Sequence, residues 1–461
     1  MPRLNKHPAS FNEPKWKIYQ TVKKRRTIRR RLVRSAAKLF FYCTLATLAV
    51  IGVIFWFSGS ETNRDQSSDR AAAISEHSNN QQLDKTFIRS LVQDHSLVNL
   101  SEKQIDIKSD GKTLHLETTI DIELQRYLIN KMDRRNSRYI GIVALEPETG
   151  KVVMMASFDK NEPKHNVCLD SRFPAASVFK IVTAAAAVEE CGLTSSSTLS
   201  FNGMQHTLYK RQLKNQTNKY TNRITFRDSF AKSVNPVFGK IGKLRLGKDS
   251  LQEYAEAFGF NATIDFEKQL SPSRISIADD PYNWAEIASG FNHDTTLSPL
   301  HGAMLAAIIV NEGQSVQPFI IDKITTDDKT LFHADPGATS RNRVVASDTA
   351  REVYHLMEAT VRYGTGKKAF RGYRRDPVLS KLSIGGKTGS INNKRHDLRY
   401  DWFVGFAADK EDVRHLAIAV FVAHEKYIGI RASQYARMAI KKYFDNAFSK
   451  DTAQTHAKQT G

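Results

Sequence analysis

The sequence predicts an α/β (α+β) protein built on a mixed, mostly antiparallel five-stranded sheet, with helices on both faces and a helical subdomain. Three observations lead to this prediction. Two apolar runs lie early in the chain, three lie near its end, and a long apolar helix lies between the two groups. Strands grouped in this way form a sheet whose faces the intervening helices cover. A separate apolar stretch near the N-terminus predicts one transmembrane helix in addition.

A strongly basic arm occupies residues 1–35. The chain of 461 residues carries a formal net charge of +20, and this arm holds twelve Lys and Arg residues against the single acid Glu13. A tail that binds nucleic acid is one explanation for such a run, and a topology signal beside a membrane span is another. The segment that follows favours the second explanation, so we expect no nucleic acid among the partners.

Residues 36–57 form an apolar stretch interrupted only by Lys38 near its start. At about 1.5 Å per residue, a helix of this length crosses a hydrocarbon core of roughly 30 Å. Because the basic residues precede it, the positive-inside rule places the N-terminus in the cytoplasm and the bulk of the chain outside, in a periplasmic or extracellular position. A cleaved signal peptide is the competing interpretation, but no clear cleavage site follows. We therefore expect a single-pass protein of the cytoplasmic (inner) membrane.

Two segments follow the apolar stretch. Residues 58–85 are rich in Ser, Asn, Gln, Asp and Glu, which predicts a flexible linker. Residues 86–135 contain an alternating strand at 113–119 and a helix at 122–132, too little to form an independent domain. We expect this segment to be a pedestal packed against the main domain.

The main domain, 136–448, contains the five predicted strands. The early pair, 140–145 and 151–157, is joined by Pro147-Glu148-Thr149-Gly150, which is typical of a hairpin turn. The later runs comprise three strands, 382–391, 401–408 and 416–424, and a helix, 432–448. Trp402 and Phe403 are expected in the core of a central strand, and the polar residues 449–461 are expected to form a disordered tail.

Residues 174–191 predict a buried helix that carries Ser177 in its first turn and ends before Gly192. Ser177 and Lys180 are three residues apart, so their side chains lie on one helix face, close enough for the amine to take the hydroxyl proton. Burial lowers the pKa of a lysine, as a base acting near neutral pH requires. A Ser-x-x-Lys pattern also arises by chance, so further motifs are needed to support a catalytic interpretation.

Two such motifs follow in order, Ser233-Val234-Asn235 and Lys387-Thr388-Gly389-Ser390. With Ser177 and Lys180, they resemble the three motifs of the penicillin-binding transpeptidase and serine β-lactamase superfamily. The resemblance covers roughly residues 113–448 and includes these further segments: Thr118 to Asp121, Gly141 to Gly150, Leu297 to Leu300, Asn311 to Gly313, Tyr363 to Gly366 and Asp401 to Gly405. Two residues depart from the family pattern, because Ala176 replaces the usual glycine and Ser390 the commoner threonine.

The resemblance implies a role for each motif residue. Ser177 would be the nucleophile, Lys180 its base, Ser233 a proton relay, and Asn235 a partner of Lys180 and the substrate. Lys387, Thr388, Gly389 and Ser390 would bind the substrate, Lys387 also favouring a neutral Lys180, while the backbone N–H groups of Ser177 and Ser390 form the oxyanion hole. The alternative for Ser233 and Asn235 is helix capping before Pro236. No metal or organic cofactor is expected.

The resemblance further implies a monofunctional, membrane-anchored D,D-transpeptidase that cross-links peptidoglycan stem peptides and is acylated by β-lactam antibiotics. Its other partners would be the membrane, through residues 36–57, and proteins of cell-wall synthesis. A β-lactamase or β-lactam receptor, a D,D-carboxypeptidase and a non-catalytic scaffold remain alternatives. A β-lactamase needs a second base, and the sequence marks neither Glu286 nor Glu312 for that role. Cys168 and Cys191 flank the nucleophile helix and either pair or stay as buried thiols.

Overall fold

The computed structural model describes residues 85–109, 111–335, 342–411 and 414–460, with side chains as far as Asp451. The predicted arm, the predicted transmembrane helix and nearly all of the predicted linker lie outside these residues. Residues 82–461 form one compact unit. In the part of the chain that is described, no helix is long and apolar enough to cross a membrane.

The predicted five-stranded sheet is present, in the spatial order β11-β12-β13-β3-β4. Its strands are β3 (Ser137–Leu145), β4 (Val152–Asp159), β11 (Leu382–Asn392), β12 (Arg399–Asp409) and β13 (His415–His424). Every neighbouring pair is antiparallel, so the expectation of a mixed sheet is wrong. The reason is the connectivity: β3–β4 and β11–β12–β13 are hairpin meanders, and β13 joins them by pairing antiparallel with β3.

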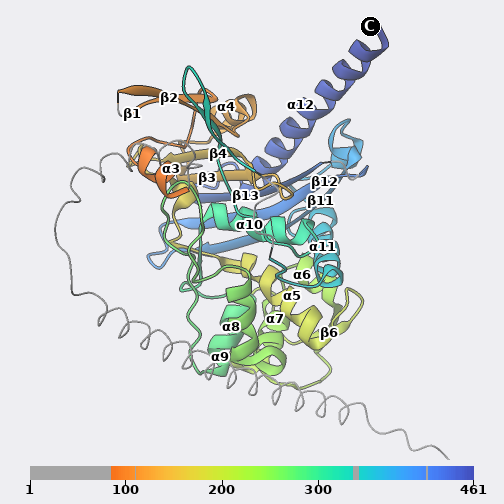
Figure 1. Ribbon diagram of the computed structural model, residues 1–461. Coiled ribbons are helices and arrows are strands. Elements are labelled where there is room, and N and C mark those ends of the chain that lie inside the picture. The colour runs from red at the N-terminus through yellow and green to blue at the C-terminus, as the bar shows by residue number, and fades with distance from the viewer. Residues whose placement is uncertain (1–84, 110, 336–341, 412–413, 461) are drawn as a thin grey trace, which may run out of the picture. The chain divides into compact units, whose positions relative to one another are not determined.

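Helices cover both faces of this sheet, as predicted (Figure 1). The helices are α3 (Lys85–Leu91), α4 (Ile122–Lys131), α5 (Lys180–Cys191), α6 (Phe226–Ala231), α7 (Asn235–Ile241), α8 (Gly247–Ala257), α9 (Pro281–Ser289), α10 (Pro299–Val310), α11 (Ser347–Arg362) and α12 (Ala432–Thr460). Helices α4 and α12 pack on one face, and α10 and α11 on the other. Helix α5 packs against α11 and also against α8 and α9. The last two belong with α6 and α7 to the helical subdomain.

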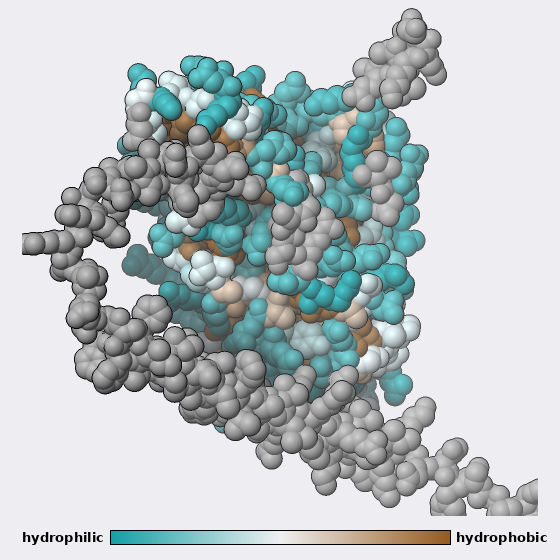
Figure 2. Space-filling view, in the orientation of Figure 1, coloured by the Kyte–Doolittle hydropathy of each residue, from teal (hydrophilic) through white to brown (hydrophobic). Residues whose placement is uncertain are grey.

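Two apolar cores result, one on each side of the five-stranded sheet. Phe403 lies in the core shared with α12, whereas Trp402, its neighbour on β12, lies in the core shared with α10. Successive strand residues point to opposite faces, so one strand supplies both cores. The face seen in Figure 2 is mostly hydrophilic, and its apolar residues appear in small separate groups.

The C-terminal helix is longer than predicted. Helix α12 continues to Thr460, so the expected helix end at residue 448 and the expected disorder of 449–460 are wrong. These residues are polar but include no Gly or Pro, so nothing in the sequence stops a helix that packing has already started. The guanidinium group of Arg414 also pairs with the carboxylate of Asp451, with 2.8 Å between Nη2 and Oδ1.

A second sheet, of four antiparallel strands, lies in the pedestal region. It consists of β1 (Gln104–Ser109), β2 (Lys112–Thr118), β9 (Ile321–Thr325) and β10 (Thr330–His333). The predicted strand 113–119 is β2, and the predicted helix 122–132 is α4 with Asp121 as its N-cap. The pairing of β2 with β9 was not predicted, because the two strands are about two hundred residues apart in sequence.

Two short ribbons complete the strands: β5 (Phe173–Pro174) pairs with β8 (Thr296–Leu297), and β6 (Thr198–Phe201) pairs with β7 (Asn222–Thr225). Helix α5 follows β5 after one 3-10 turn, Ala176–Phe179. Its run of small and apolar residues is fully buried, and Gly192 ends it in the left-handed conformation with φ 62°. The predicted start of this helix at residue 174 is therefore wrong: Ser177 lies in the 3-10 turn, and Lys180 is the first residue of the α-helix.

Candidate active site

Ser177 lies in the turn between β5 and α5, and this turn is held from several sides. The indole N–H of Trp402 donates to the carbonyl of Pro174 at 2.9 Å, and the Ala175 N–H donates to the carbonyl of Thr295, also at 2.9 Å. A Cβ atom on Gly290 would stand 2.0 Å from the Ala176 carbonyl oxygen, so only glycine fits there. The Ser177 backbone is thus fixed by its contacts with β12 and with the segment after α9.

Lys180 is completely buried, and its amine lies among three oxygen atoms. Lys180 Nζ is 2.8 Å from Ser177 Oγ and 2.9 Å from Asn235 Oδ1, and it also donates to the carbonyl of Ser289. A neutral amine has two hydrogens and one lone pair. The Asn235 and Ser289 oxygens can only accept, so they take the two hydrogens and leave the lone pair facing the Ser177 hydroxyl.

Both lysines of the site have lowered pKa values. Burial, followed by the nearby charge of Lys387, lowers the pKa of Lys180 well below its ordinary value. Burial alone lowers the pKa of Lys387 to about 7. Among the described residues, no carboxylate forms an ion pair with either lysine to oppose these effects. A neutral Lys180 beside a hydroxyl is the arrangement of an activated nucleophile.

Ser233 lies on the segment that joins α6 to α7, and Asn235 is the first residue of α7. The Asn235 side-chain N–H donates to the His206 carbonyl at 3.1 Å, which orients its oxygen toward Lys180. Ser233 Oγ accepts a hydrogen bond from Lys387 Nζ at 3.0 Å. The N-cap of α7 is Val234, and no side-chain hydrogen bond caps the helix, so the structure does not support the capping alternative.

The motif Lys387 to Ser390 lies on β11, the edge strand of the five-stranded sheet. Lys387 is completely buried, and its Nζ also donates to the Thr388 carbonyl at 2.8 Å. Gly389 packs against the nucleophile turn, since a Cβ there would lie 3.4 Å from the Ala175 carbonyl oxygen. Ser390 is exposed, and its hydroxyl donates to Asp401 Oδ1 on β12 at 3.2 Å. The open edge of β11 therefore runs beside Ser177.

Two site residues, Ala176 and Ser233, adopt the left-handed backbone conformation, with φ values of 48° and 56°. This conformation is costly for residues with a side chain and is concentrated at functional sites. Glycine adopts it freely, and glycine is the residue that the resemblance predicts at the position of Ala176. The substitution retains the turn but adds local strain directly before Ser177.

The structure adds residues for which the sequence analysis gave no role. The Thr365 and Thr388 hydroxyl oxygens lie 2.5 Å apart, beside Lys387. The Thr365 N–H donates to the Ala231 carbonyl at 3.0 Å, and a Cβ on Gly364 would stand 2.3 Å from the same oxygen. The segment Tyr363 to Gly366 was noted only as part of the family resemblance. Nothing in the sequence marked the Ser289 carbonyl, at the last residue of α9, or Gly290, the C-cap of that helix.

Other residues considered in the sequence analysis stay apart from this arrangement. Within the described residues, neither Glu286 nor Glu312 has a side-chain hydrogen bond to Ser177 or Lys180. Cys168 and Cys191 are not joined in a disulfide. Cys168 is buried against β3 and β4, where burial raises the pKa of its thiol to about 12, so it is an inert packing residue.

The arrangement can be compared with known proteins. A family model described as the penicillin binding protein transpeptidase domain matches residues 140–443. Stage V sporulation protein D of Bacillus subtilis (strain 168) is 26% identical over 321 residues, which are 64% of this chain and 47% of that protein. Peptidoglycan D,D-transpeptidase PbpA of Mycobacterium tuberculosis (strain ATCC 25618 / H37Rv) is 26% identical over 318 residues, 61% of each protein. The chain thus spans about half to three-fifths of the length of these curated relatives.

Solved structures show the same fold. The D,D-transpeptidase domain of a peptidoglycan glycosyltransferase from Eggerthella lenta superposes with a TM-score of 0.59 at 24% identity, covering 72% of this chain and 83% of that one. PBPA from Mycobacterium tuberculosis gives a TM-score of 0.57 at 23% identity, covering 70% and 81%. A penicillin G acyl-enzyme complex of penicillin-binding protein A from M. tuberculosis gives 0.52 at 23% identity, covering 70% and 79%.

Proposed function

The chain belongs to the penicillin-binding protein transpeptidase family, and from this premise we propose that it is a serine D,D-transpeptidase. Its substrates are peptidoglycan stem peptides that end in D-alanyl-D-alanine, and β-lactam antibiotics acylate the same serine. One observation carries the proposal. The buried Lys180 amine, with acceptors for two hydrogens, lies 2.8 Å from Ser177 Oγ.

The reaction proceeds in two acyl transfers. Lys180 takes the proton from Ser177 Oγ, which attacks the carbonyl carbon between the two D-alanines and forms an ester. The C–N bond breaks, and the terminal D-alanine leaves with a proton returned to its nitrogen. An amine of a neighbouring strand then attacks the ester and forms the new amide; the C–O bond breaks, and the proton lost by the amine returns through Lys180 to Ser177 Oγ. In both steps, the backbone N–H groups of Ser177 and Ser390 stabilise the negative charge on the carbonyl oxygen.

The remaining residues position the substrate and the base. Lys387, with the hydroxyls of Thr388 and Thr365, binds the terminal carboxylate of the donor peptide. The positive charge of Lys387 also keeps Lys180 neutral, because two ammonium groups in one buried site repel each other. Ser233 bonds to Lys387 and relays the proton that the leaving amine requires.

Two observations favour transpeptidation over β-lactam hydrolysis. A β-lactamase must activate water against the ester, and among the described residues no carboxylate hydrogen-bonds to Ser177 or Lys180. In addition, the free edge of β11 offers a long peptide a strand to pair with. A carboxypeptidase would use the same residues and differ only in accepting water. A non-catalytic scaffold protein would not need two buried lysines, Lys180 and Lys387, with lowered pKa values.

We also propose that residues 36–57 anchor the protein in the cytoplasmic membrane with the catalytic domain outside. The apolar length and the basic residues before it support this topology. Protease added to spheroplasts should digest the catalytic domain and leave the arm intact. Digestion of the arm alone would contradict this topology. Contacts with other proteins of cell-wall synthesis are compatible with such a location.

Labelled penicillin tests the proposed function directly. We expect the intact mass to increase by one drug molecule, with the label on Ser177, and the adduct to last for many minutes. Ser177→Ala should abolish labelling, whereas Ser196→Ala, which changes an exposed serine beyond the same helix, should not. Labelling that survives Ser177→Ala would show that the nucleophile is wrong. Rapid, repeated penicillin hydrolysis would instead favour the β-lactamase alternative. Release of D-alanine from a stem peptide with only water as acceptor would indicate a carboxypeptidase.

A further inference from the structure

A cleft of about 870 Å³ lies at the end of β11, where the hairpin to β12 turns back. Four cationic side chains line it, those of Arg138, Arg172, Lys394 and Arg395, against two acidic ones. The acidic ones are Asp397, which accepts from Asn393, and Glu425, which pairs with Lys160. The lining therefore carries two more cationic than acidic side chains.

The cleft continues the open edge of β11 beyond Ser390. Backbone groups of a strand alternate sides, so Ser390 and Asn392 both direct theirs toward this edge. The Asn392 carbonyl is already bonded to His293 Nε2 at 2.8 Å. A peptide paired with the edge therefore loses its next partner at Asn392 and turns away from the strand. From Ser390 to Asn393, which lines the cleft, the rise is about 10 Å.

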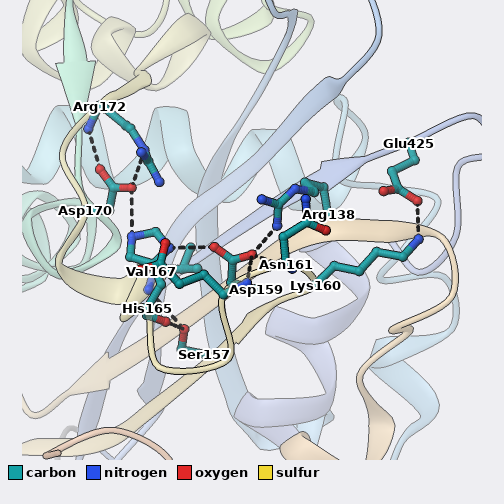
Figure 3. Close-up of polar contacts among 11 residues, drawn as sticks. Arg138, Ser157, Asp159, Lys160, Asn161, His165, Val167, Asp170, Arg172 and Glu425 are labelled. Atoms are coloured by element: carbon teal, nitrogen blue, oxygen red, sulfur yellow. Dashed lines mark hydrogen bonds and ion pairs between the residues drawn. The ribbon is translucent and has the colours of Figure 1, made fainter.

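Two of the cations are held in place by acids that lie behind the cleft wall. Figure 3 shows a continuous chain from Arg172 through Asp170, His165 and Asp159 to Arg138. Arg172 Nε lies 2.6 Å from Asp170 Oδ2, and His165 Nδ1 lies 2.8 Å from Asp159 Oδ2. Because Arg138 pairs with Asp159 and Arg172 with Asp170, both arginines are held in position and their charges are largely compensated.

The other two cations stand on a rigid hairpin tip. Asn393 Oδ1 accepts from the backbone N–H groups of Asp397 and Leu398, both at 3.1 Å, and these bonds lock the turn. Lys394 Nζ forms an ion pair with Asp294 Oδ1 at 3.3 Å, and both side chains are exposed. Arg395 is also exposed, and within the described residues its guanidinium has no acidic partner. Among the described residues, Arg395 is therefore the cation of the cleft lining that has no acidic partner.

We propose that this basic cleft is a subsite for a carboxylate on the donor stem peptide, one to three residues before the D-alanine that acylates Ser177. The inference rests on the proposed function, because it assumes that the donor pairs with β11 and places its terminal carboxylate at Lys387. The chain before the reacting carbonyl then runs antiparallel to β11, from the cleft toward Ser390. The side-chain carboxylate of the donor peptide then lies near Arg395, beyond Asn392, where pairing with β11 ends.

The test uses two penicillins whose acyl side chains have equal length, one ending in a carboxylate and the other in the matching primary amide. The acyl side chain occupies the place of the donor residues before the reacting carbonyl. Second-order rates of Ser177 acylation are measured for the full chain in detergent micelles at low salt. We expect the carboxylate to react about two- to fivefold faster, which is the range for an exposed charge pair.

In Arg395→Ala, the ratio of the acylation rates of the carboxylate and the amide penicillin should be close to one, and the rate with the amide should be unchanged. Arg126→Ala, which removes an exposed arginine on α4 outside the cleft, should keep the full preference. Added salt should weaken the preference of the unmodified protein, because the charges are exposed to solvent.

The outcomes separate this proposal from the proposed function. If neither penicillin acylates Ser177, the proposed function fails and the subsite fails with it. If both acylate Ser177 without a carboxylate preference, or if Arg395→Ala retains the preference, only the subsite is wrong. If acylation shows no carboxylate preference but Arg395→Ala slows transfer of the acyl group to an amine acceptor that carries a carboxylate, the cleft belongs to the acceptor and the donor assignment is overturned.

Discussion

Replacing Gly290 with alanine is expected to slow penicillin acylation of Ser177 by about 10²-fold. The new Cβ would stand 2.0 Å from the Ala176 carbonyl oxygen and 2.9 Å from the Ser177 nitrogen. Ordinary contacts between such atoms are about 3.5 Å, so the nucleophile turn must move by more than 1 Å. A displacement of roughly 1 Å at reacting groups costs about 10²-fold in rate. The Ser177 N–H, an oxyanion donor, moves with the turn.

Gly192→Ala is the matched control for this change. Gly290 and Gly192 have φ values of 64° and 62°, so alanine is strained equally at both, by about 1–2 kcal/mol. At Gly192, however, a Cβ would meet nothing within 4 Å. Both variants should therefore lose stability in thermal unfolding, but only Gly290→Ala should lose acylation rate. Equal acylation rates in the two folded variants would refute the argument that this contact positions Ser177.

Three further predictions concern the two lysines. Lys180→Ala should slow acylation by about 10²- to 10⁴-fold without unfolding the protein, as measured by labelling kinetics and circular dichroism. Acylation rate against pH should be bell-shaped: it falls at low pH as Lys180 becomes protonated, and above about pH 7 as Lys387 loses the charge that holds the carboxylate. A flat profile would contradict these roles. Lys387 has a pKa of about 7 when folded and about 10.4 when unfolded, so between these values the unfolded chain binds one more proton and the free energy of unfolding rises with pH. Lys387→Met should lower that slope by about 1.4 kcal/mol per pH unit in urea unfolding, and an unchanged slope would show that Lys387 stays charged in the folded protein.

Local sequence patterns predicted the elements that carry the site. The apolar run after Pro174 and the closing Gly192 predicted a buried helix, with Ser177 and Lys180 one turn apart. Apolar runs near the C-terminus predicted β11, β12 and β13, because strand periodicity and turn residues act over a few positions. The same local reasoning failed at the end of α12, where polar composition was taken as disorder although no residue there stops a helix.

The sequence by itself thus determined the five strand segments, the helix that carries the nucleophile and the family motifs, since each depends on neighbouring residues. Only the tertiary structure decided which distant groups meet. It paired β2 with β9, placed the Ser289 carbonyl at Lys180, and set Thr365 beside Thr388. Within the described residues, it also left Arg395, in the hairpin after β11, without an acidic partner. Such contacts depend on how whole elements pack, and no local periodicity records the packing of segments that are not neighbours in the sequence.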